Sequence, residues 1–178
     1  MSRGWRIVIA LLIAMLMLTL AADYLLAESM ALAWHVRHGF HVEMNGIRFK
    51  VPLLYYEDHG SNMLELSLST IPGRLNKKEA TIVVDFHRQR PLSEDKAEVG
   101  GARLQKWGMS RSGTRTIQMV GRTGSCTDFT GKSASIPSPY VVDCSFGDEM
   151  RIHFFGTENA VADFYSILQS AEVVRGKI

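Results

Sequence analysis

The sequence lacks the residues on which several common protein functions depend. It has only two cysteines in 178 residues, which excludes a four-thiolate zinc site. Its five prolines and its 46% hydrophobic content are typical of a folded chain rather than a disordered one. A formal net charge of +2 is too small to indicate a nucleic-acid-binding surface, so we expect no nucleic-acid partner.

Recognised motifs for catalysis and cofactor binding are also missing. The glycine-containing segment Gly121–Ser125 lacks the lysine that ends a phosphate-binding loop. His35, His38 and His41 recur every three residues, but Gly39 interrupts the helix that would gather them. We therefore interpret this segment as hydrated and membrane-proximal, with a metal site as the alternative. The sequence assigns no catalytic residue, no cofactor and no metal ligand.

What the sequence does contain is a long apolar run near its N-terminus. Every residue of Ile7–Ala22 is apolar except Thr19, and Arg3 and Arg6 precede the run. As a helix at about 1.5 Å per residue, the segment 7–27 would span about 31 Å, close to the thickness of a bilayer core. Basic residues before an apolar helix favour a cytoplasmic N-terminus. We predict a transmembrane signal anchor over this segment.

The anchor divides the rest of the chain. We expect residues 1–6 in the cytoplasm, a junction over 28–39 and an exported domain over 40–178, which makes a single-pass inner-membrane protein of a bacterial envelope. The alternative is a cleaved signal peptide, because Ala31–Ala33 is a small-x-small site. A mature chain beginning at Trp34 would then be periplasmic or secreted.

The charge has an uneven distribution. Arg3 and Arg6 account for the whole net charge, and residues 23–178 carry 18 basic and 18 acidic side chains. Within them, residues 88–122 are mostly basic and residues 123–178 mostly acidic. We interpret this as a solvated surface of mixed charge. The alternative is a basic face for an anionic glycan or lipid headgroup.

Alternating apolar residues predict a β-rich domain. Two such runs flank Asn45-Gly46, the strongest two-residue signal for a hairpin. Further strands are predicted over 64–68, 81–86, 103–109, 116–120, 126–129, 140–146 and 150–155. Residues 110–113 would separate two of these strands.

Near the C-terminus the apolar period changes to that of a helix. Val161, Phe164, Tyr165 and Leu168 form one apolar stripe, and Thr157 is placed to cap its start. A shorter helix is predicted to begin at Ser93. The fold class we predict is α+β: an N-terminal membrane helix, then a mainly antiparallel sheet packed by a C-terminal helix.

The two cysteines lie on neighbouring predicted strands. In an oxidising compartment, Cys126 and Cys144 are expected to form a disulfide. Closing a loop of about 19 residues would stabilise the fold by about 3 kcal/mol in the chain-entropy model. A redox pair is the alternative, but catalytic pairs are normally close in sequence.

One segment could support chemistry. Alternation along a strand puts Asp85 and His87 on the same face, where an acid can orient an imidazole as a general base. An exported hydrolase using this pair is the alternative function. His153 alternates with Ile152 and Phe154 and is predicted to lie on the solvated face.

The order of elements over residues 40–174 resembles small exported α+β domains of the PsbP/Mog1 type. The resemblance lies in Asn45-Gly46-Ile47 with Val51-Pro52, in the succession of strands, and in Phe154–Thr157 leading into Asp163-Phe164-Tyr165-x-x-Leu168. It implies a sheet flanked by helices and a non-enzymatic binding or assembly role, and it assigns no functional residue. We therefore expect a membrane-tethered binding or assembly module whose partners are the membrane and an envelope protein or anionic glycan.

Overall fold

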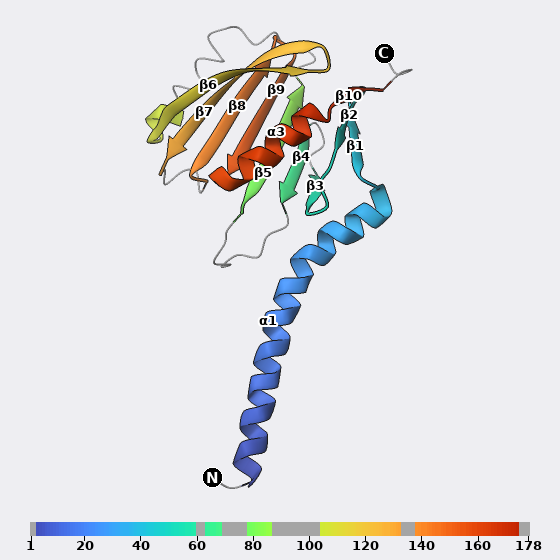
Figure 1. Cartoon of the computed structure of the whole chain (residues 1–178), viewed down its shortest axis with the longest axis vertical. Helices are drawn as coiled ribbons and strands as arrows, with labels where there is room; N and C mark the ends of the chain where they lie inside the picture. Colours follow the sequence, from blue (N-terminus) through green and yellow to red (C-terminus); the bar gives the residue numbers. More distant parts are fainter. Residues whose placement is uncertain (1–2, 60–62, 69–77, 87–103, 133–137, 175–178) are drawn as a thin grey trace.

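A computed structural model describes residues 3–59, 63–68, 78–86, 104–132 and 138–174 of the chain. A long N-terminal helix leads into a β-rich domain, and helix α3 packs on this domain near the C-terminus (Figure 1). The predicted α+β class, with mainly antiparallel sheets and a C-terminal helix, is confirmed.

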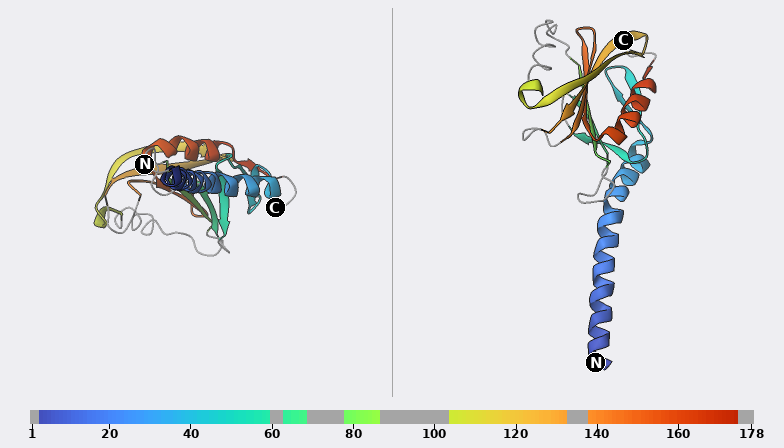
Figure 2. Two further views of the ribbon diagram at one scale, coloured as in Figure 1. Left: turned by 90° about the horizontal axis from the view of Figure 1, so that it is seen from below. Right: turned by 60° about the vertical axis from the view of Figure 1, so that its left-hand side comes forward.

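The first helix, α1 (Arg3–His38), runs through both the apolar run and the predicted junction. It stands away from the domain and meets it only near its own C-terminal end (Figures 1 and 2). There Ala31 and His35 are buried. The helix ends before Gly39, whose φ of +79° lies in the left-handed region that suits glycine at a helix end.

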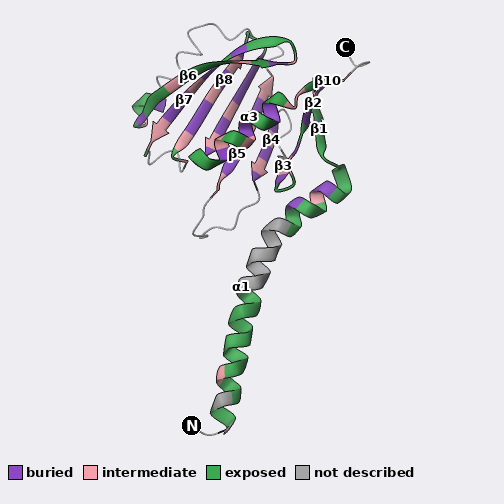
Figure 3. Ribbon diagram, in the orientation of Figure 1, coloured by how far each residue is buried: buried purple, intermediate pink, exposed green. Residues whose placement is uncertain are grey.

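The first half of α1 exposes its apolar side chains. Nine large apolar side chains between Ile7 and Leu18 are 45–74% exposed (Figure 3). Residues 15–18 are four of them, and successive helical residues point about 100° apart, so these side chains surround the helix. Within the described part of the chain, no helix combines the length and the apolar character needed to cross a membrane.

The predicted hairpin is confirmed as strands β1 (His41–Met44) and β2 (Ile47–Lys50). Asn45 and Gly46 both have positive φ angles, 51° and 75°, as the two-residue turn that matches strand twist requires. The short strand β10 (Glu172–Val173) pairs with the other edge of β2, so the C-terminal segment completes a three-stranded sheet.

Seven strands form the larger sheet in the order β3-β4-β5-β9-β8-β7-β6, with antiparallel neighbours throughout. Their bounds are Tyr55–His59 (β3), Met63–Leu68 (β4), Ala80–Phe86 (β5), Met109–Met119 (β6), Arg122–Gly131 (β7), Tyr140–Phe146 (β8) and Met150–Gly156 (β9). Most predicted strands are confirmed, because alternating apolar residues place one face of each strand against the core.

Helix α3 (Val161–Gln169) covers one face of this sheet (Figure 2). Phe164, Ile167 and Leu168 are its buried residues, as the apolar stripe predicted in outline. They join the main core, which includes Phe154 and the two cysteines. This face of the sheet is called the α3 face below.

The predicted helix cap at Thr157 is wrong. Thr157 precedes the short 3₁₀ helix η1 (Glu158–Ala160), and its side chain makes no capping hydrogen bond. Its hydroxyl instead accepts a hydrogen bond from the backbone N–H of Glu79 at 3.0 Å. The side chain therefore ties the start of the helical segment to Glu79, the residue that precedes β5, rather than capping α3.

The strand predicted over 103–109 is also wrong in part. Leu104–Lys106 are helical, and β6 begins at Met109. The helical turn explains the apolar pattern, because residues three apart share a helix face, and Leu104 and Trp107 join a small cluster with Phe129. The helix predicted from Ser93 lies outside the described residues.

Candidate functional site

Asp128 is a buried carboxylate in the middle of β7, with 3% of its surface exposed. Residues two apart on a strand point to the same side, so Asp128 shares the α3 face with Cys126. A buried carboxylate is unstable unless it is paired and hydrogen-bonded. The residues that pair with and hydrogen-bond to Asp128 are therefore the first candidates for a functional site.

Strand β6 reaches these partners through a β-bulge. The register changes between Arg111, opposite Phe129, and Gly113, opposite Asp128, which leaves Ser112 as the extra residue. The sequence indicated a separator between two strands over 110–113; this was wrong, because β6 is continuous there. Small polar residues suit a bulge as well as a turn, and bulges commonly re-aim side chains beside functional sites.

The glycine after the bulge leaves space over the carboxylate. Gly113 lies opposite Asp128, and a Cβ at that position would be 3.6 Å from Oδ2. A longer side chain would extend into the region above Asp128. The missing side chain leaves room for Arg115, two residues further along the same face of β6.

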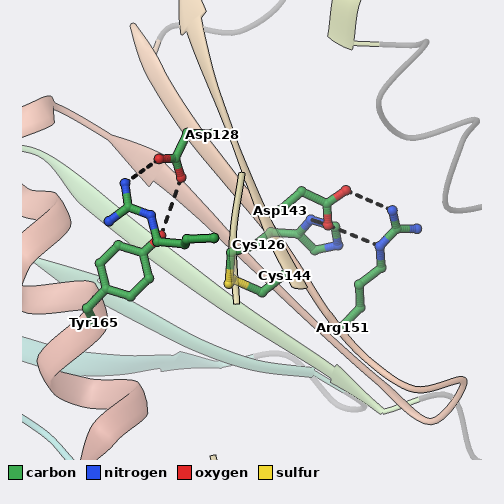
Figure 4. Close-up of a disulfide and its surroundings, with 8 residues drawn as sticks. Cys126, Asp128, Asp143, Cys144, Arg151 and Tyr165 are labelled. Carbon is green, nitrogen blue, oxygen red and sulfur yellow. Dashed lines mark hydrogen bonds and ion pairs between the residues drawn. A yellow bond between two sulfur atoms is a disulfide. The ribbon is translucent and has the colours of Figure 1, made fainter. Parts of the chain in front are cut away.

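Arg115 and Tyr165 each donate a hydrogen bond to one carboxylate oxygen of Asp128, and Figure 4 shows how Tyr165 lies against Asp128. Nη2 of Arg115 donates to Oδ2 at 2.5 Å, and the Tyr165 hydroxyl donates to Oδ1 at 3.3 Å. The guanidinium carbon also lies 4.7 Å from the centre of the Tyr165 ring, within the range of cation–π attraction. The Arg115 side chain is 48% exposed and that of Asp128 only 4%, so the pair has one buried and one accessible member.

The protonation of these groups follows from their surroundings. Burial, and then the charge of Asp128, raise the pKa of Tyr165, so its hydroxyl stays a donor. Burial also raises the pKa of Tyr140, with Asp128 as the next cause. Hydrogen bonding to Asp128 raises the pKa of Arg115. The cluster therefore offers stable N–H and O–H donors and is poorly suited to proton abstraction by tyrosine.

The cluster opens into a hollow of about 490 Å³. It is lined by polar side chains and the bulge, and we call it the Asp128 hollow: Ser112, Gly113, Thr114, Arg115, Asp128, Thr130, Tyr140 and Glu158. Its volume falls within the range of small-molecule sites, but its lining is more polar than is usual for them. The hollow can therefore take a hydrated, hydrogen-bonding ligand rather than an apolar one.

A second arginine–aspartate pair lies on the opposite face of the sheet. Asp143 on β8 lies between two residues of the main core, so its side chain points away from α3. Arg151 donates to it twice, from Nε to Oδ1 at 3.1 Å and from Nη2 to Oδ2 at 2.7 Å. Nδ1 of His153 lies 3.4 Å from Oδ1. His153 lies on the face away from the main core, as the alternation predicted, but its side chain is only 29% exposed and lies in register with Asp143.

The predicted cysteine pairing is confirmed. Cys126 and Cys144 are direct cross-strand partners on β7 and β8, and their sulfur atoms are 2.03 Å apart. Both residues are fully buried. The link joins the strand that carries Asp128 to the strand that carries Asp143, and so lies between the two polar clusters (Figure 4).

The proposed Asp85/His87 pair is placed only in part. Asp85 lies on β5 in register with Arg151, far along the sheet order from β6 and β7. His87 lies outside the described residues. Asp85, the described member of the pair, is therefore not part of the Asp128 hollow.

The three regularly spaced histidines also take separate places. His35 and His38 are on α1, whereas His41 begins β1. The interpretation of this segment as hydrated is wrong for His35, which is 4% exposed. Its Nδ1 lies 2.8 Å from the carbonyl oxygen of Gly39 and its Nε2 lies 3.1 Å from that of Pro52. This imidazole holds the end of α1 against the domain. Over the described residues, no cluster of three potential metal ligands occurs.

Sequence reasoning missed both members of the Arg115–Asp128 pair. One signal was present: Asp128 alternates with Cys126 in β7, so a carboxylate occupied a position that the strand pattern turned inward. No such signal identified Arg115, since its approach depends on the bulge. In comparisons with known proteins, no family model matches the chain and no curated protein matches it significantly.

Proposed function

We propose that this chain is a membrane-tethered binding module of the bacterial envelope, with the Asp128 hollow as its ligand-binding surface. The presence of this hollow is the observation that supports a binding role. Its arginine is held by a buried carboxylate yet remains 48% exposed, which orients N–H donors toward an arriving ligand. The resemblance to PsbP/Mog1-type domains favours the same non-enzymatic role.

Attachment to a membrane through α1 is the second part of the proposal. It is supported by the apolar side chains that surround the helix between Ile7 and Leu18. A helix that is apolar on all sides is stable when those sides are covered by protein or lipid. The apolar run continues in sequence to Ala22, and the two arginines before it favour a cytoplasmic N-terminus, which puts the domain outside the cytoplasm.

The tether is tested by extracting bacterial membranes at alkaline pH. Full-length protein is expected to stay with the membrane. A variant with Leu11, Leu12, Leu16 and Leu18 changed to serine is expected in the soluble fraction, because each buried leucine contributes about 1.5–3 kcal/mol to membrane attachment.

The matched control changes Met30, Leu32 and Val36 to serine, since these exposed residues lie on the same helix beyond the run. This control should remain in the membrane. Release of the unaltered protein, or a mature N-terminus at Trp34, would show that the chain is not anchored by α1 and would favour the cleaved, soluble alternative.

The binding role is tested by filling the hollow. Gly113→Val adds a side chain over Asp128 in a backbone conformation that other residues adopt, and valine suits a strand. Immobilised full-length protein is expected to retain a component of a solubilised envelope fraction, and the filled variant is expected to lose it. Arg122→Met is the control, because Arg122 pairs with Glu149 and does not line the hollow. Equal retention by the original chain and Gly113→Val would contradict binding at the hollow.

The alternative function, an exported hydrolase using Asp85 and His87, would place its chemistry elsewhere. Asp85 faces Arg151 across β5 and β9 rather than the Asp128 hollow. Within the described residues, no observation favours this alternative over ligand binding.

A further inference from the structure

We propose that the ligand of the Asp128 hollow is a neutral oligosaccharide, recognised through its hydroxyl groups. This inference rests on the proposed binding function and adds the chemical class of the ligand. It follows from the charge of the lining, from its hydroxyl groups and from the shape that the bulge creates.

The charge of the hollow disfavours an anionic ligand. Arg115 is the one basic side chain among the described residues that line it, and Asp128 already neutralises that charge. Glu158 is exposed and adds a further negative charge, so the lining is net negative. A phosphate, sulfate or carboxylate would have to compete with Asp128 for the guanidinium while facing Glu158. The anionic glycan expected from the basic segment is therefore not favoured at this surface.

The hydroxyl groups of the lining favour a ligand that both donates and accepts hydrogen bonds. Ser112, Thr130 and Tyr140 line the hollow with hydroxyl-bearing side chains. Each hydroxyl can donate one hydrogen bond and accept others, as a sugar hydroxyl can. Such a mixture is complementary to a polyhydroxylated ligand.

A cationic ligand is the nearest competitor, and the same lining makes it the weaker one. Asp128 is 4% exposed and is occupied by Arg115 and Tyr165, which leaves Glu158 as the accessible carboxylate of the lining. One exposed carboxylate in water contributes little to binding, since exposed ion pairs are worth about 0–1 kcal/mol. The hydroxyls of Ser112, Thr130 and Tyr140 and an oriented guanidinium can together make several hydrogen bonds of about 1 kcal/mol each.

The shape also suits a sugar chain. The bulge at Ser112 and the bare Gly113 open the hollow at the surface rather than enclosing it. An open hollow lets the rest of a long chain remain in solvent while one or two sugar units are held. Tyr140 supplies an aromatic ring with an apolar body and a polar tip, which can contact both the C–H bonds and the hydroxyls of a sugar.

The experiment uses full-length protein in lipid nanodiscs, which avoids sugar-based detergents. Titration calorimetry compares neutral probes, maltohexaose, cellohexaose and chitohexaose, with anionic hexagalacturonate and cationic hexalysine. At least one neutral probe is expected to bind at millimolar concentration or below, more tightly than either charged probe. Gly113→Val should weaken that binding at least about tenfold, because a tenfold loss corresponds to about 1.4 kcal/mol, or one to two hydrogen bonds.

A second variant keeps the test valid if Gly113→Val does not fold. Thr130→Val keeps the side-chain volume, removes one lining hydroxyl and should weaken binding about threefold to tenfold, in line with one hydrogen bond. Arg122→Met should leave binding unchanged. Arg122 has the same 48% exposed side chain as Arg115 but pairs with Glu149 outside the hollow.

The remaining outcomes separate the ligand class from the binding function. If hexalysine or hexagalacturonate binds instead and Gly113→Val abolishes that binding, the glycan proposal is overturned and the binding function stands. The same conclusion follows if no neutral probe binds but Gly113→Val still abolishes retention of a component of the envelope fraction. If neither the probes nor the envelope fraction distinguishes Gly113→Val from the original chain, both proposals fail.

Discussion

Two arginine–aspartate pairs lie on opposite faces of the same sheet and differ in how much water reaches them. Arg151 and Asp143 are 10% and 11% exposed, and the arginine donates to both carboxylate oxygens. Arg115 is 48% exposed although Asp128 is 4% exposed. Both members of the first pair are largely shielded from solvent, so this pair has a structural role. The second has a buried anchor and an accessible donor, an arrangement that can serve recognition. Exposure of the arginine, rather than the pairing itself, distinguishes the two.

The largest expected effect comes from breaking the enclosed pair. Arg151→Met leaves the Asp143 carboxylate without its two strongest donors, and we expect a loss of about 3–5 kcal/mol in the free energy of unfolding. Urea unfolding measures it. The double variant Arg151→Met/Asp143→Leu should recover most of the loss, because an apolar pair of similar volume is often neutral. If the double variant were as unstable as the single one, the loss would come from packing and not from the uncompensated carboxylate.

The disulfide between the pairs is expected to have the next largest effect. Changing Cys126 and Cys144 to alanine should lower the free energy of unfolding by about 3 kcal/mol, the value for a loop of about 19 residues. Thermal unfolding with and without a reductant measures this. Reductant should lower the midpoint of the original protein and leave that of the alanine variant unchanged. An equal effect of reductant on both proteins would show that the bond is not formed in the folded chain.

Removing one donor from Asp128 gives a smaller effect. Tyr165→Phe deletes the hydroxyl that donates to Oδ1 at 3.3 Å, and a hydrogen bond to a charged group is worth about 1.5 kcal/mol. The matched control is Tyr55→Phe, which deletes a hydroxyl that donates to Asp163 of α3 at 3.1 Å. Both variants should lose similar stability in urea unfolding. Only Tyr165→Phe should also weaken ligand binding, and an equal loss of binding in both would place the site elsewhere.

Local patterns predicted the parts of the fold that depend on neighbouring residues. The turn at Asn45-Gly46, the alternation along β8 and β9 and the stripe of α3 are each decided within a few residues, because backbone conformation and side-chain period are local properties. The pairing of Cys126 with Cys144 followed from the number of cysteines and their positions on neighbouring strands. These features needed no knowledge of the whole sheet.

The candidate site depends on register, which is not local. Arg115 meets Asp128 because Ser112 is inserted into β6 opposite β7, and the same small polar residues are equally compatible with a turn. The alternation around His153 indicated correctly which residues face the core. It did not reveal that the other face holds Arg151 against Asp143 on the adjacent strand. Both pairs join residues on different strands, so neither could be predicted before the strands were placed.

The smallest effect on stability, and the sharpest test of the comparison, comes from the accessible arginine. Arg115→Met removes a half-exposed partner of Asp128, and we expect a loss of about 1 kcal/mol in the free energy of unfolding, as for exposed ion pairs. The loss is expected to be small because removal of the half-exposed Arg115 side chain opens Asp128 to water and because Tyr165 still donates to it. Urea unfolding under the conditions used for Arg151→Met gives the two losses on one scale.

Arg122→Met provides the reference for both readouts, stability and binding. Its side chain is as exposed as that of Arg115, but its partner Glu149 is 70% exposed, so the change in stability should be close to zero. Arg115→Met should weaken binding to the hollow about tenfold, whereas Arg122→Met should not change it. If Arg115→Met were as destabilising as Arg151→Met and bound ligand normally, both arginines would have the same structural role, and the difference in exposure would have no functional meaning.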